Sequence, residues 1–379
     1  MKILIITTSY PLKQDGSEAA GAFVRDFAHT LGKDHQVAVV YPDNSIRANY
    51  LDDIVLHYPF RVTKLPLSLL SPKKPSNWGP IIKTLSSGQN TVDYAAIDFE
   101  PDHIFALWTL PSGYWAYRIA KKYKISYSTW SLGSDIWSLG KIPVVRSILK
   151  IVLKNSTHCF ADGLKLSGDV EKISGRKCQF LASLRILPTS KKKVFRKEPP
   201  YRLAFLGRWH VNKGIDLLLE ALGGLSDADW EKIESIKIAG GGPLEALVTG
   251  AIKKLQANNY PVTQLGFLDA QEAANLYHWA DYLVIPSRIE SIPVVFSDAM
   301  QSSCPVIATP VGDLPSLIKR LNVGFLAKNV SSSAIREIIR VALHSSPVKY
   351  AEAIKVASSK FHIKTTASDY MSQINKQKY

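Results

Sequence analysis

Short apolar runs recur along the chain, and most are followed by a polar loop and then by apolar residues at helical spacing. This alternation of strand and helix is typical of α/β proteins with parallel sheets. The runs that predict buried strands in the first half are residues 2–8, 36–41, 101–108, 125–129 and 155–161. Those in the second half are residues 201–206, 236–239, 282–285 and 305–308. We therefore expect two Rossmann-like, doubly wound α/β domains.

Composition divides the chain between these two sets of strands. The segment between them is rich in Lys and Pro, as linkers are, and shows no helical or strand period. We expect an N-terminal domain at 1–188, a linker at 189–200, a C-terminal domain at 201–360 and a final helix at 361–379. Residues 43–98 contain many Pro, Ser and Asn without a clear period, so we expect irregular structure there.

Glu290 lies between two of the predicted strands. Pro286 ends the apolar run 282–285, and Pro293 suits the first turn of a helix. The carboxylate therefore follows the carboxyl end of a strand and precedes a helix N-terminus, where ligands, phosphates among them, bind in open α/β sheets. It could accept hydrogen bonds from a sugar while Asp298, eight positions on, reaches a ribose. An ordinary crossover with a solvated Glu is the alternative on spacing alone.

Two other loops carry candidate phosphate-binding residues. Arg208 and Lys213 lie five positions apart after the strand 201–206, so a guanidinium fork and an ammonium could straddle a diphosphate. Gly16 and Gly21 lie between the first strand and the first helix, where glycine lets backbone N–H groups approach a phosphate. No G-x-G-x-x-G fingerprint occurs. Solvated surface cations and an ordinary turn glycine are the alternatives for these positions.

The residues around Glu290 resemble the signature of the retaining GT-B glycosyltransferases of the GT4 group. The matching positions are Pro286, Ser287, Glu290, Ser291, Pro293, Ala299, Met300, Pro305, Val306, Ile307, Ala308 and Thr309. Two positions depart from the family pattern, since Asp298 stands in place of the second Glu and Ser303 in place of a Gly. Asp keeps the charge but is one methylene shorter than Glu.

Further landmarks of the same family lie in both halves of the chain. The order Gly-Arg-x-x-x-x-Lys-Gly at residues 207–214 is similar to the diphosphate clamp of the family. The run Gly-Ser-Asp-Ile at residues 133–136 resembles an N-terminal landmark. Leu132 precedes it where many members have a His, so the role of that His is not carried over. The resemblance spans nearly the whole chain.

The resemblance implies a GT-B fold, with the two Rossmann-like domains facing across a cleft and the last helix crossing back to the first domain. It implies transfer of a hexosyl unit from a nucleoside diphosphate sugar to a hydroxyl acceptor with retention of configuration. It implies no metal, and no cofactor besides the sugar nucleotide as co-substrate. The residues it implies are Glu290, Arg208 and Lys213 for catalysis, these three with Gly21, Leu268, Val294 and Asp298 for the donor, and Gly133 and Asp135 on the acceptor side.

Composition and charge limit the partners. The 379 residues are 46% hydrophobic and 21% charged, as in soluble globular proteins, and the three cysteines show no metal-ligand or disulfide spacing. The first apolar run is too short for a signal peptide, and no run has the length of a membrane span. The net charge is +15, and residues 118–197 hold 18 Lys and Arg against 4 Asp and Glu. Such a block favours an anionic partner, with a solvated basic face as the alternative.

Residues 143–154 combine aliphatic positions with Arg146, Lys150 and Lys154 at intervals of four. This pattern is typical of a helix in a membrane interface, and a buried helix with a solvated stripe is the alternative. We expect a cytoplasmic protein, peripherally associated with the cytoplasmic face of the membrane, that acts on a lipid-linked or glycan acceptor in cell-envelope polysaccharide or glycolipid synthesis.

Three other functions are compatible with parts of the pattern. A GT-B phosphorylase or epimerase would share the clamp, and a non-catalytic partner subunit would fit the departures at Leu132 and Asp298. A nucleic-acid-binding module would use the basic block, but no recognition fold accompanies that charge, so we expect no nucleic acid partner.

Overall fold

The structure is a computed structural model that describes residues 1–11, 19–44, 48–62, 67, 70, 74–188 and 193–375. The chain forms two compact units. The N-terminal unit comprises residues 1–11, 19–183 and 363–375, and the C-terminal unit comprises residues 184–362 within the described ranges. Gly16, the first four linker residues and the last four residues of the expected final helix lie outside the described residues.

The N-terminal unit is built on one sheet, whose order within the described residues is β3-β4-β2-β1-β5-β6-β7-β8. All neighbouring pairs are parallel except β3 with β4. The strands are β1 (Lys2–Ile6), β2 (Gln36–Asp43), β3 (Tyr50–Leu51), β4 (Val55–Arg61), β5 (His103–Leu107), β6 (Ser126–Ser131), β7 (His158–Ala161) and β8 (Cys178–Phe180). The helices are α1 (Ala19–Gly32), α2 (Trp78–Phe99), α3 (Ser112–Tyr123), α4 (Ser134–Trp137), α5 (Pro143–Asn155), α6 (Leu164–Ser174) and α15 (Ile363–Asn375).

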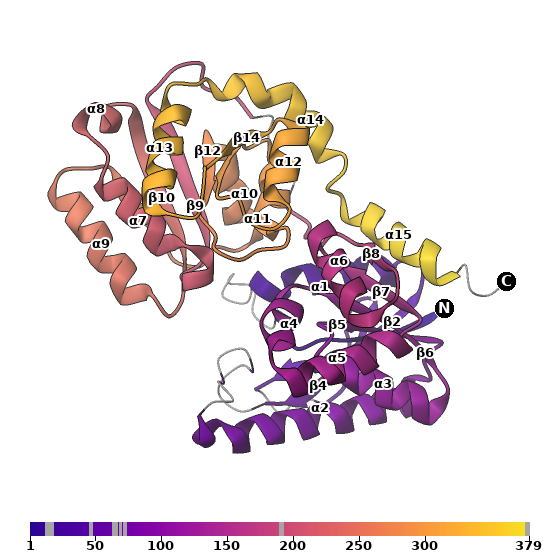
Figure 1. Cartoon of the computed structure of the whole chain (residues 1–379). Coiled ribbons are helices and arrows are strands. Elements are labelled where there is room, and N and C mark those ends of the chain that lie inside the picture. Colours follow the sequence, from indigo (N-terminus) through magenta and orange to yellow (C-terminus); the bar gives the residue numbers. More distant parts are fainter. Residues whose placement is uncertain are drawn as a thin grey trace. The chain divides into compact units, whose positions relative to one another are not determined.

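Helices cover both faces of this sheet (Figure 1). One face packs against α2, α3 and α5 around a core that includes Val92, Trp115 and Val152. The other face carries α1 and also α15, although α15 comes from the far end of the chain. Tyr370 of α15 is buried, and its ring stacks on Phe105 of β5 with centroids 4.2 Å apart. Aromatic packing thus makes α15 part of the core of the N-terminal unit.

The structure corrects the expectation of irregular structure between residues 43 and 98. This region contains β4 and the 22-residue helix α2, which packs on β4, β2 and β1. The helix buries small residues, Thr84, Gly88 and Ala95 among them, where an amphipathic pattern would show large apolar ones. A Cβ on Gly88 would lie 2.5 Å from the ring of Trp115, so the bulk that fills this contact comes from α3. The sequence of α2 therefore shows few large apolar residues at helical spacing, which is why no helix was expected there.

The C-terminal unit is a second, all-parallel sheet of order β11-β10-β9-β12-β13-β14 among the described residues. Its strands are β9 (Tyr201–Arg208), β10 (Ile233–Gly241), β11 (Val262–Gln264), β12 (Tyr282–Ile285), β13 (Val306–Ala308) and β14 (Gly324–Leu326). Its helices are α7 (Ile215–Gly223), α8 (Asp227–Trp230), α9 (Glu245–Ala257), α10 (Ala270–Trp279), α11 (Val294–Gln301), α12 (Leu314–Leu321), α13 (Ser332–Leu343) and α14 (Ala351–Ser358). The expectation of two Rossmann-like α/β domains is confirmed.

The segment before β9 packs on the C-terminal unit. The units divide between Ser183 and Leu184, ahead of residue 188, where composition placed the boundary. Leu184 is buried, and the ammonium of Lys193, although in a Lys-rich segment, is buried and donates to the backbone carbonyl oxygens of Tyr277 and Ala280. The composition of this segment is that of a linker, but the segment packs on the C-terminal unit and its Lys193 binds backbone carbonyl oxygens.

No helix among the described residues has both the length and the apolar character needed to cross a membrane.

Candidate functional site

The C-terminal sheet reverses its strand order at β9. This strand lies between β10 and β12, so the chain continues to one side after β9 and to the other side from β12. The loops that follow β9 and β12 therefore leave neighbouring parallel strands at the same edge of the sheet. Such a reversal is the usual ligand-binding place of an open α/β sheet. Arg208 and Lys213 lie on the first loop, and Glu290 lies on the second.

The two loops touch through their backbones. The N–H of Arg288 donates to the carbonyl oxygen of Asn212 at 2.8 Å. Gly214 has a φ of +68°, and a Cβ there would lie 1.9 Å from the carbonyl oxygen of Pro286. Only glycine tolerates both the left-handed backbone and this approach. The sequence pattern Lys-Gly therefore serves a close contact with the Glu290 loop.

A lysine and a carboxylate face each other where the loops meet. Lys213 Nζ donates to Glu290 Oε1, and the hydroxyl of Ser287 donates to the same oxygen at 3.1 Å. The side chain of Glu290 is 11% exposed and that of Lys213 is 37% exposed. Arg208 is exposed at the end of β9, and its guanidinium has no ion-pair partner among the described residues. The structure thus brings Lys213 and Glu290 together and leaves the cation of Arg208 accessible.

Two residues that the sequence reading missed also join these loops. The guanidinium of Arg288 forks to the carboxylate of Asp216, with Nη1 to Oδ1 at 2.7 Å and Nη2 to Oδ2 at 2.6 Å. This bidentate bond outweighs burial, which acts in the opposite direction, and holds the pKa of Asp216 below its ordinary value. The sequence shows the two opposite charges but not that the elements which carry them lie side by side.

The other side of the Glu290 loop rests on the loop after β13. Thr309 Oγ1 donates to the carbonyl oxygen of Ser287 at 2.5 Å, and the N–H of Asp313 donates to the carbonyl oxygen of Ser291 at 3.2 Å. Gly312 lies so close that a Cβ there would be 2.3 Å from the carbonyl oxygen of Glu290. The backbone that carries Glu290 is therefore held from both neighbouring loops.

Asp298, which was expected to reach a ribose, lies in a buried ion pair. Its side chain is 0% exposed on the inner face of α11, and its Oδ2 accepts hydrogen bonds from Arg185 Nε at 2.7 Å and from the Tyr277 hydroxyl at 3.1 Å. Burial alone would lower the pKa of Arg185, but the charge of Asp298 raises it above its ordinary value. This carboxylate therefore neutralises a buried cation of the segment before β9 and has no exposed surface.

Two further donor-site predictions fall at the same edge of the sheet. Val294 is the first residue of α11 and is partly exposed, so it stands where the helix presents its amino end. Leu268, also partly exposed, follows Phe267, whose ring covers Gly241 at the carboxyl end of β10. A Cβ on Gly241 would lie 2.5 Å from that ring. Both positions remain predictions for contact with a nucleotide.

The predicted residues of the N-terminal unit have structural surroundings of their own. Gly21, in the first turn of α1, packs so closely on Tyr10 that a Cβ would lie 2.7 Å from the Tyr10 Cα. Gly133 caps α4 with a φ of +101°. Asp135 is buried, burial raises the pKa of its carboxyl, and its oxygens accept the N–H groups of Thr109 and Leu132 at 2.7 and 3.2 Å. Asp135 therefore links the loops after β5 and β6, and its acceptor-side role stays a prediction.

Within the described ranges, no group of three or more His, Cys, Asp or Glu side chains could hold a metal ion.

Comparison with known proteins places these loops in a family. The model of the glycosyl transferases group 1 family matches residues 200–345, the part that contains the loops after β9, β12 and β13. An uncharacterized glycosyltransferase of Methanocaldococcus jannaschii is 25% identical over 71% of this chain and 72% of its own length. A D-inositol 3-phosphate glycosyltransferase of Corynebacterium aurimucosum is 27% identical over 45% of this chain and 43% of its own. A putative teichuronic acid biosynthesis glycosyltransferase of Bacillus subtilis is 26% identical over 64% of this chain and 61% of its own. This chain thus spans less than two thirds of the latter two relatives.

Solved structures share the fold over the whole chain. The sucrose-phosphate synthase of Thermosynechococcus elongatus aligns with 100% of this chain and 98% of its own at a TM-score of 0.74 and 17% identity. The Anabaena protein HepE, solved with UDP and glucose, aligns with 99% of this chain and 100% of its own at a TM-score of 0.71 and 15% identity. Residues 200–345 thus match the group 1 glycosyltransferase family, and the chain has the GT-B fold.

Proposed function

We propose that the protein transfers a hexosyl unit from a nucleoside diphosphate sugar to a hydroxyl acceptor with retention of configuration. The observation that carries this proposal is the meeting of Lys213 and Glu290 at the reversal of the C-terminal sheet, with the side chain of Arg208 exposed at the end of β9. Cations suit a leaving diphosphate, and a carboxylate held by a fixed loop suits the hydroxyls of a sugar.

The chemistry asks mainly for positioning and charge. The bond between the anomeric carbon and the diphosphate oxygen breaks, and a bond to the acceptor oxygen forms on the same face. The acceptor proton passes to the departing diphosphate. Arg208 and Lys213 would neutralise the charge that develops on this diphosphate, while Glu290 would accept hydrogen bonds from the transferred sugar. Lys213 leaves its bond to Glu290 when the diphosphate arrives.

Arg208→Ala tests the assignment. We expect the variant to lose about 2–4 kcal/mol of transition-state stabilisation, the usual cost of removing one preorganised donor. A thermal-shift panel of nucleoside diphosphate sugars selects the donor, and turnover is then measured for the wild type and the variant. UDP-sugars come first because HepE was solved with UDP. Arg340→Ala is the matched control, since Arg340 is exposed on α13 and pairs with Asp229.

The outcomes separate the proposal from its alternatives. Full activity in a folded Arg208→Ala variant would contradict the donor-site assignment. Wild-type protein that binds a nucleotide sugar without transferring it would favour a non-catalytic partner subunit. Formation of a sugar phosphate or of an epimerised nucleotide sugar, with the donor alone or with phosphate, would favour the sugar-phosphate enzymes.

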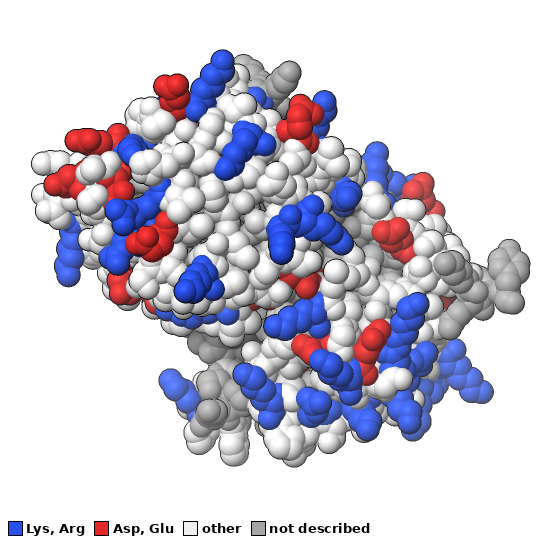
Figure 2. Space-filling model, turned by 45° about the horizontal axis from the view of Figure 1, so that its top comes forward, with Lys and Arg blue, Asp and Glu red and all other residues white. Residues whose placement is uncertain are grey.

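We further propose a lipid-linked acceptor and peripheral association with an anionic cytoplasmic leaflet. Arg146, Lys150 and Lys154 are all exposed on α5, beside Val144, which is 73% exposed, and Ile151, which is 47% exposed. Figure 2 shows Lys and Arg side chains gathered over the N-terminal unit, in the lower part of the view. Exposed cations beside exposed aliphatic side chains suit a membrane interface. The similarity to the teichuronic acid glycosyltransferase agrees with an acceptor in the cell envelope.

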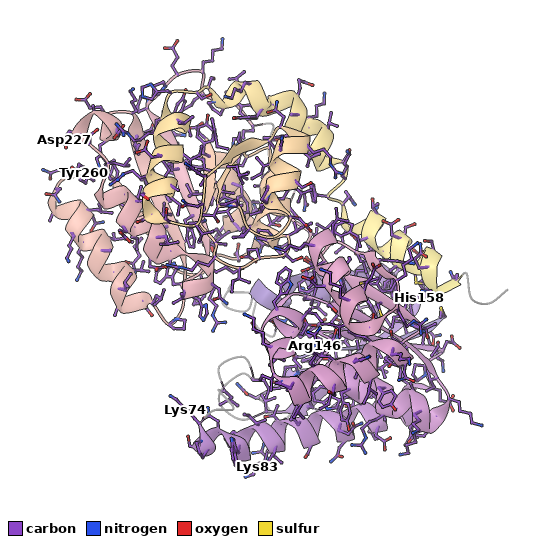
Figure 3. All side chains as sticks on the ribbon, in the orientation of Figure 1. Lys74, Lys83, Arg146, His158, Asp227 and Tyr260 are labelled. Atoms are coloured by element: carbon purple, nitrogen blue, oxygen red, sulfur yellow. The ribbon has the colours of Figure 1, made fainter. Side chains whose placement is uncertain are left out.

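The amino end of α2 presents a second set of this kind in the N-terminal unit. Trp78 is 57% exposed and Ile82 is 62% exposed, and the exposed Lys74 and Lys83 lie near them in sequence. Figure 3 shows Lys74 and Lys83 at this end of α2 and Arg146 on α5. Tryptophan and lysine together are typical of the boundary between lipid headgroups and acyl chains.

Co-sedimentation with liposomes tests the membrane proposal. We expect binding that rises with the fraction of anionic lipid and falls with salt, because each basic side chain near such a surface contributes about 1 kcal/mol. Replacing Arg146, Lys150 and Lys154 by Ser should weaken binding, whereas replacing the exposed Lys253 and Lys254 of α9 should not. Binding that ignores lipid charge, or no binding, would contradict this proposal and leave the transferase assignment intact.

A further inference from the structure

Arg288 connects two loops through side-chain bonds that the family signature does not describe. It lies two residues before Glu290, and its guanidinium makes the bidentate bond to Asp216 in the first turn of α7. The same Nη1 also donates to the carbonyl oxygen of Val211 at 2.7 Å. One planar group on the Glu290 loop thus makes one hydrogen bond to the loop after β9 and two to the first turn of α7.

The positions of these three bonds decide what they control. Val211 and Asp216 stand on either side of Lys213 in the chain, so a group bound to both limits the movement of the segment that carries Lys213. The backbone bond from Arg288 to Asn212 lies inside the same segment. Movement of the Lys213 backbone relative to the Glu290 loop would therefore break the fork, the bond to Val211 or both.

We propose that Arg288 is a positioning residue that acts through Asp216 to hold the backbone that carries Lys213 against the loop that carries Glu290. The inference rests on the proposed function, because it gives the pair a diphosphate and a sugar to receive. Arg288 itself touches neither. It keeps the two loops in one register, so the Lys213 ammonium can turn from the carboxylate to the diphosphate while the backbones that carry the two side chains stay at a fixed separation.

Lysine cannot replace arginine in this arrangement. A guanidinium offers several N–H groups in one plane, so it can fork to a carboxylate and still reach a carbonyl oxygen, whereas an ammonium acts as a point charge. The side chains of Arg288 and Asp216 are 28% and 27% exposed, so water can solvate either partner once the fork is lost. Arg288→Lys should therefore fold normally and lose the geometry alone.

The first experiment measures binding without any need for turnover. Calorimetry compares the nucleoside diphosphate chosen by the thermal-shift panel with the corresponding nucleoside. In Arg288→Lys we expect the dissociation constant of the diphosphate to rise about tenfold, the scale of one charge-assisted hydrogen bond, and that of the nucleoside to change less than about twofold. Turnover of the donor should fall about tenfold to a hundredfold, because a misplaced charge costs more in the transition state.

The second experiment is a double-mutant cycle with Asp216→Asn. If both residues act through one fork, Arg288→Lys combined with Asp216→Asn should lose no more affinity than Arg288→Lys alone. Arg340→Lys is the control, because Arg340 also binds an aspartate, Asp229, but lies on α13, and it should bind the diphosphate as the wild type does.

Four outcomes would overturn the proposal. Unchanged diphosphate binding and turnover in Arg288→Lys would do so, as would equal losses for the nucleoside and the diphosphate, because a general disturbance of the unit predicts equal losses. Losses that multiply in the double variant would remove Asp216 as the route. A wild-type protein that binds no nucleotide would overturn the proposed function and this inference together, which distinguishes that failure from the others.

Discussion

Asp298→Asn should destabilise the protein without changing how it recognises a ribose. The substitution keeps the shape of the side chain and removes its charge. The guanidinium of Arg185, whose side chain is 9% exposed, then loses its counter-ion, which in the wild type lies 2.6 Å from Nη2. Breaking a buried ion pair by removing one partner costs about 3–5 kcal/mol, because the remaining charge is left in a poorly solvating place. We expect a loss of that size in the free energy of unfolding.

Urea unfolding followed by tryptophan fluorescence measures this loss. Arg185→Met should cost a similar amount, since it leaves the carboxylate of Asp298 without its cation. The double variant should lose less than the sum of the two single variants, because neither charge is then left alone. The coupling of contacting residues in such cycles is about 0.5–3 kcal/mol, and a buried charge pair belongs at the upper end.

Binding supplies the result that would refute this reasoning. The wild type and Asp298→Asn are compared for the affinity of a nucleoside diphosphate and of its 2′,3′-dideoxy analogue. A carboxylate with no exposed surface predicts the same affinity ratio in both proteins. If Asp298→Asn kept its stability and lost the preference for the ribose hydroxyls, Asp298 would be a ribose ligand and the buried pair with Arg185 would be the wrong description.

Three other substitutions have defined outcomes. Burial lowers the pKa of His103 from 6.5 to about 3, so between these pH values the unfolded chain binds a proton at this residue and the native state does not. The free energy of unfolding therefore falls on acidification by up to about 1.4 kcal/mol per pH unit. His103→Gln should reduce that slope in urea unfolding measured across pH 3–6.5, and an identical slope would contradict this. Gly214→Ala places a Cβ 1.9 Å from the Pro286 oxygen and should cost more than about 1 kcal/mol of stability as well as diphosphate affinity, whereas Gly223→Ala, with open space around it, should cost neither. Glu290→Gln should lower turnover at least about tenfold without raising the dissociation constant of the nucleoside diphosphate, because the change releases a lysine ammonium; weaker binding would mean that the carboxylate holds the nucleotide.

The elements around Glu290 were predictable because local and long-range forces agree there. The run at β12 is fully buried between neighbouring strands, Pro286 ends it, and Pro293 immediately precedes the expected helix, which begins at Val294. Neighbouring strands in an α/β sheet then bring the loops after β9 and β12 together. The approach of Lys213 to Glu290 follows from this topology, and the sequence reading had assigned both residues to one site on the strength of the family pattern.

The role of Asp298 was not predictable from its own surroundings in the chain. Its partner Arg185 lies 113 positions earlier, and the register of α11 decides which side of the helix faces inward. The sequence did indicate that Arg185 is buried, since it stands between Leu184 and Ile186 in an apolar stretch. An arginine in such a stretch needs a buried acceptor, but the sequence does not say which of the aspartates supplies it.

The sequence also could not show which of the two units carries each basic residue, and this placement changes the membrane argument. Twelve of the eighteen basic residues in 118–197 and all four acidic ones lie before residue 184, so this block contributes a surplus of eight to the N-terminal unit and not fourteen. The described remainder includes Lys193, bound to carbonyl oxygens, and Arg196, paired with Glu234. The proposal then depends chiefly on exposed cations such as the three of α5. At about 1 kcal/mol each, these three alone would raise affinity for an anionic surface about a hundredfold. That strength suits reversible association, so salt should release the protein from liposomes without detergent.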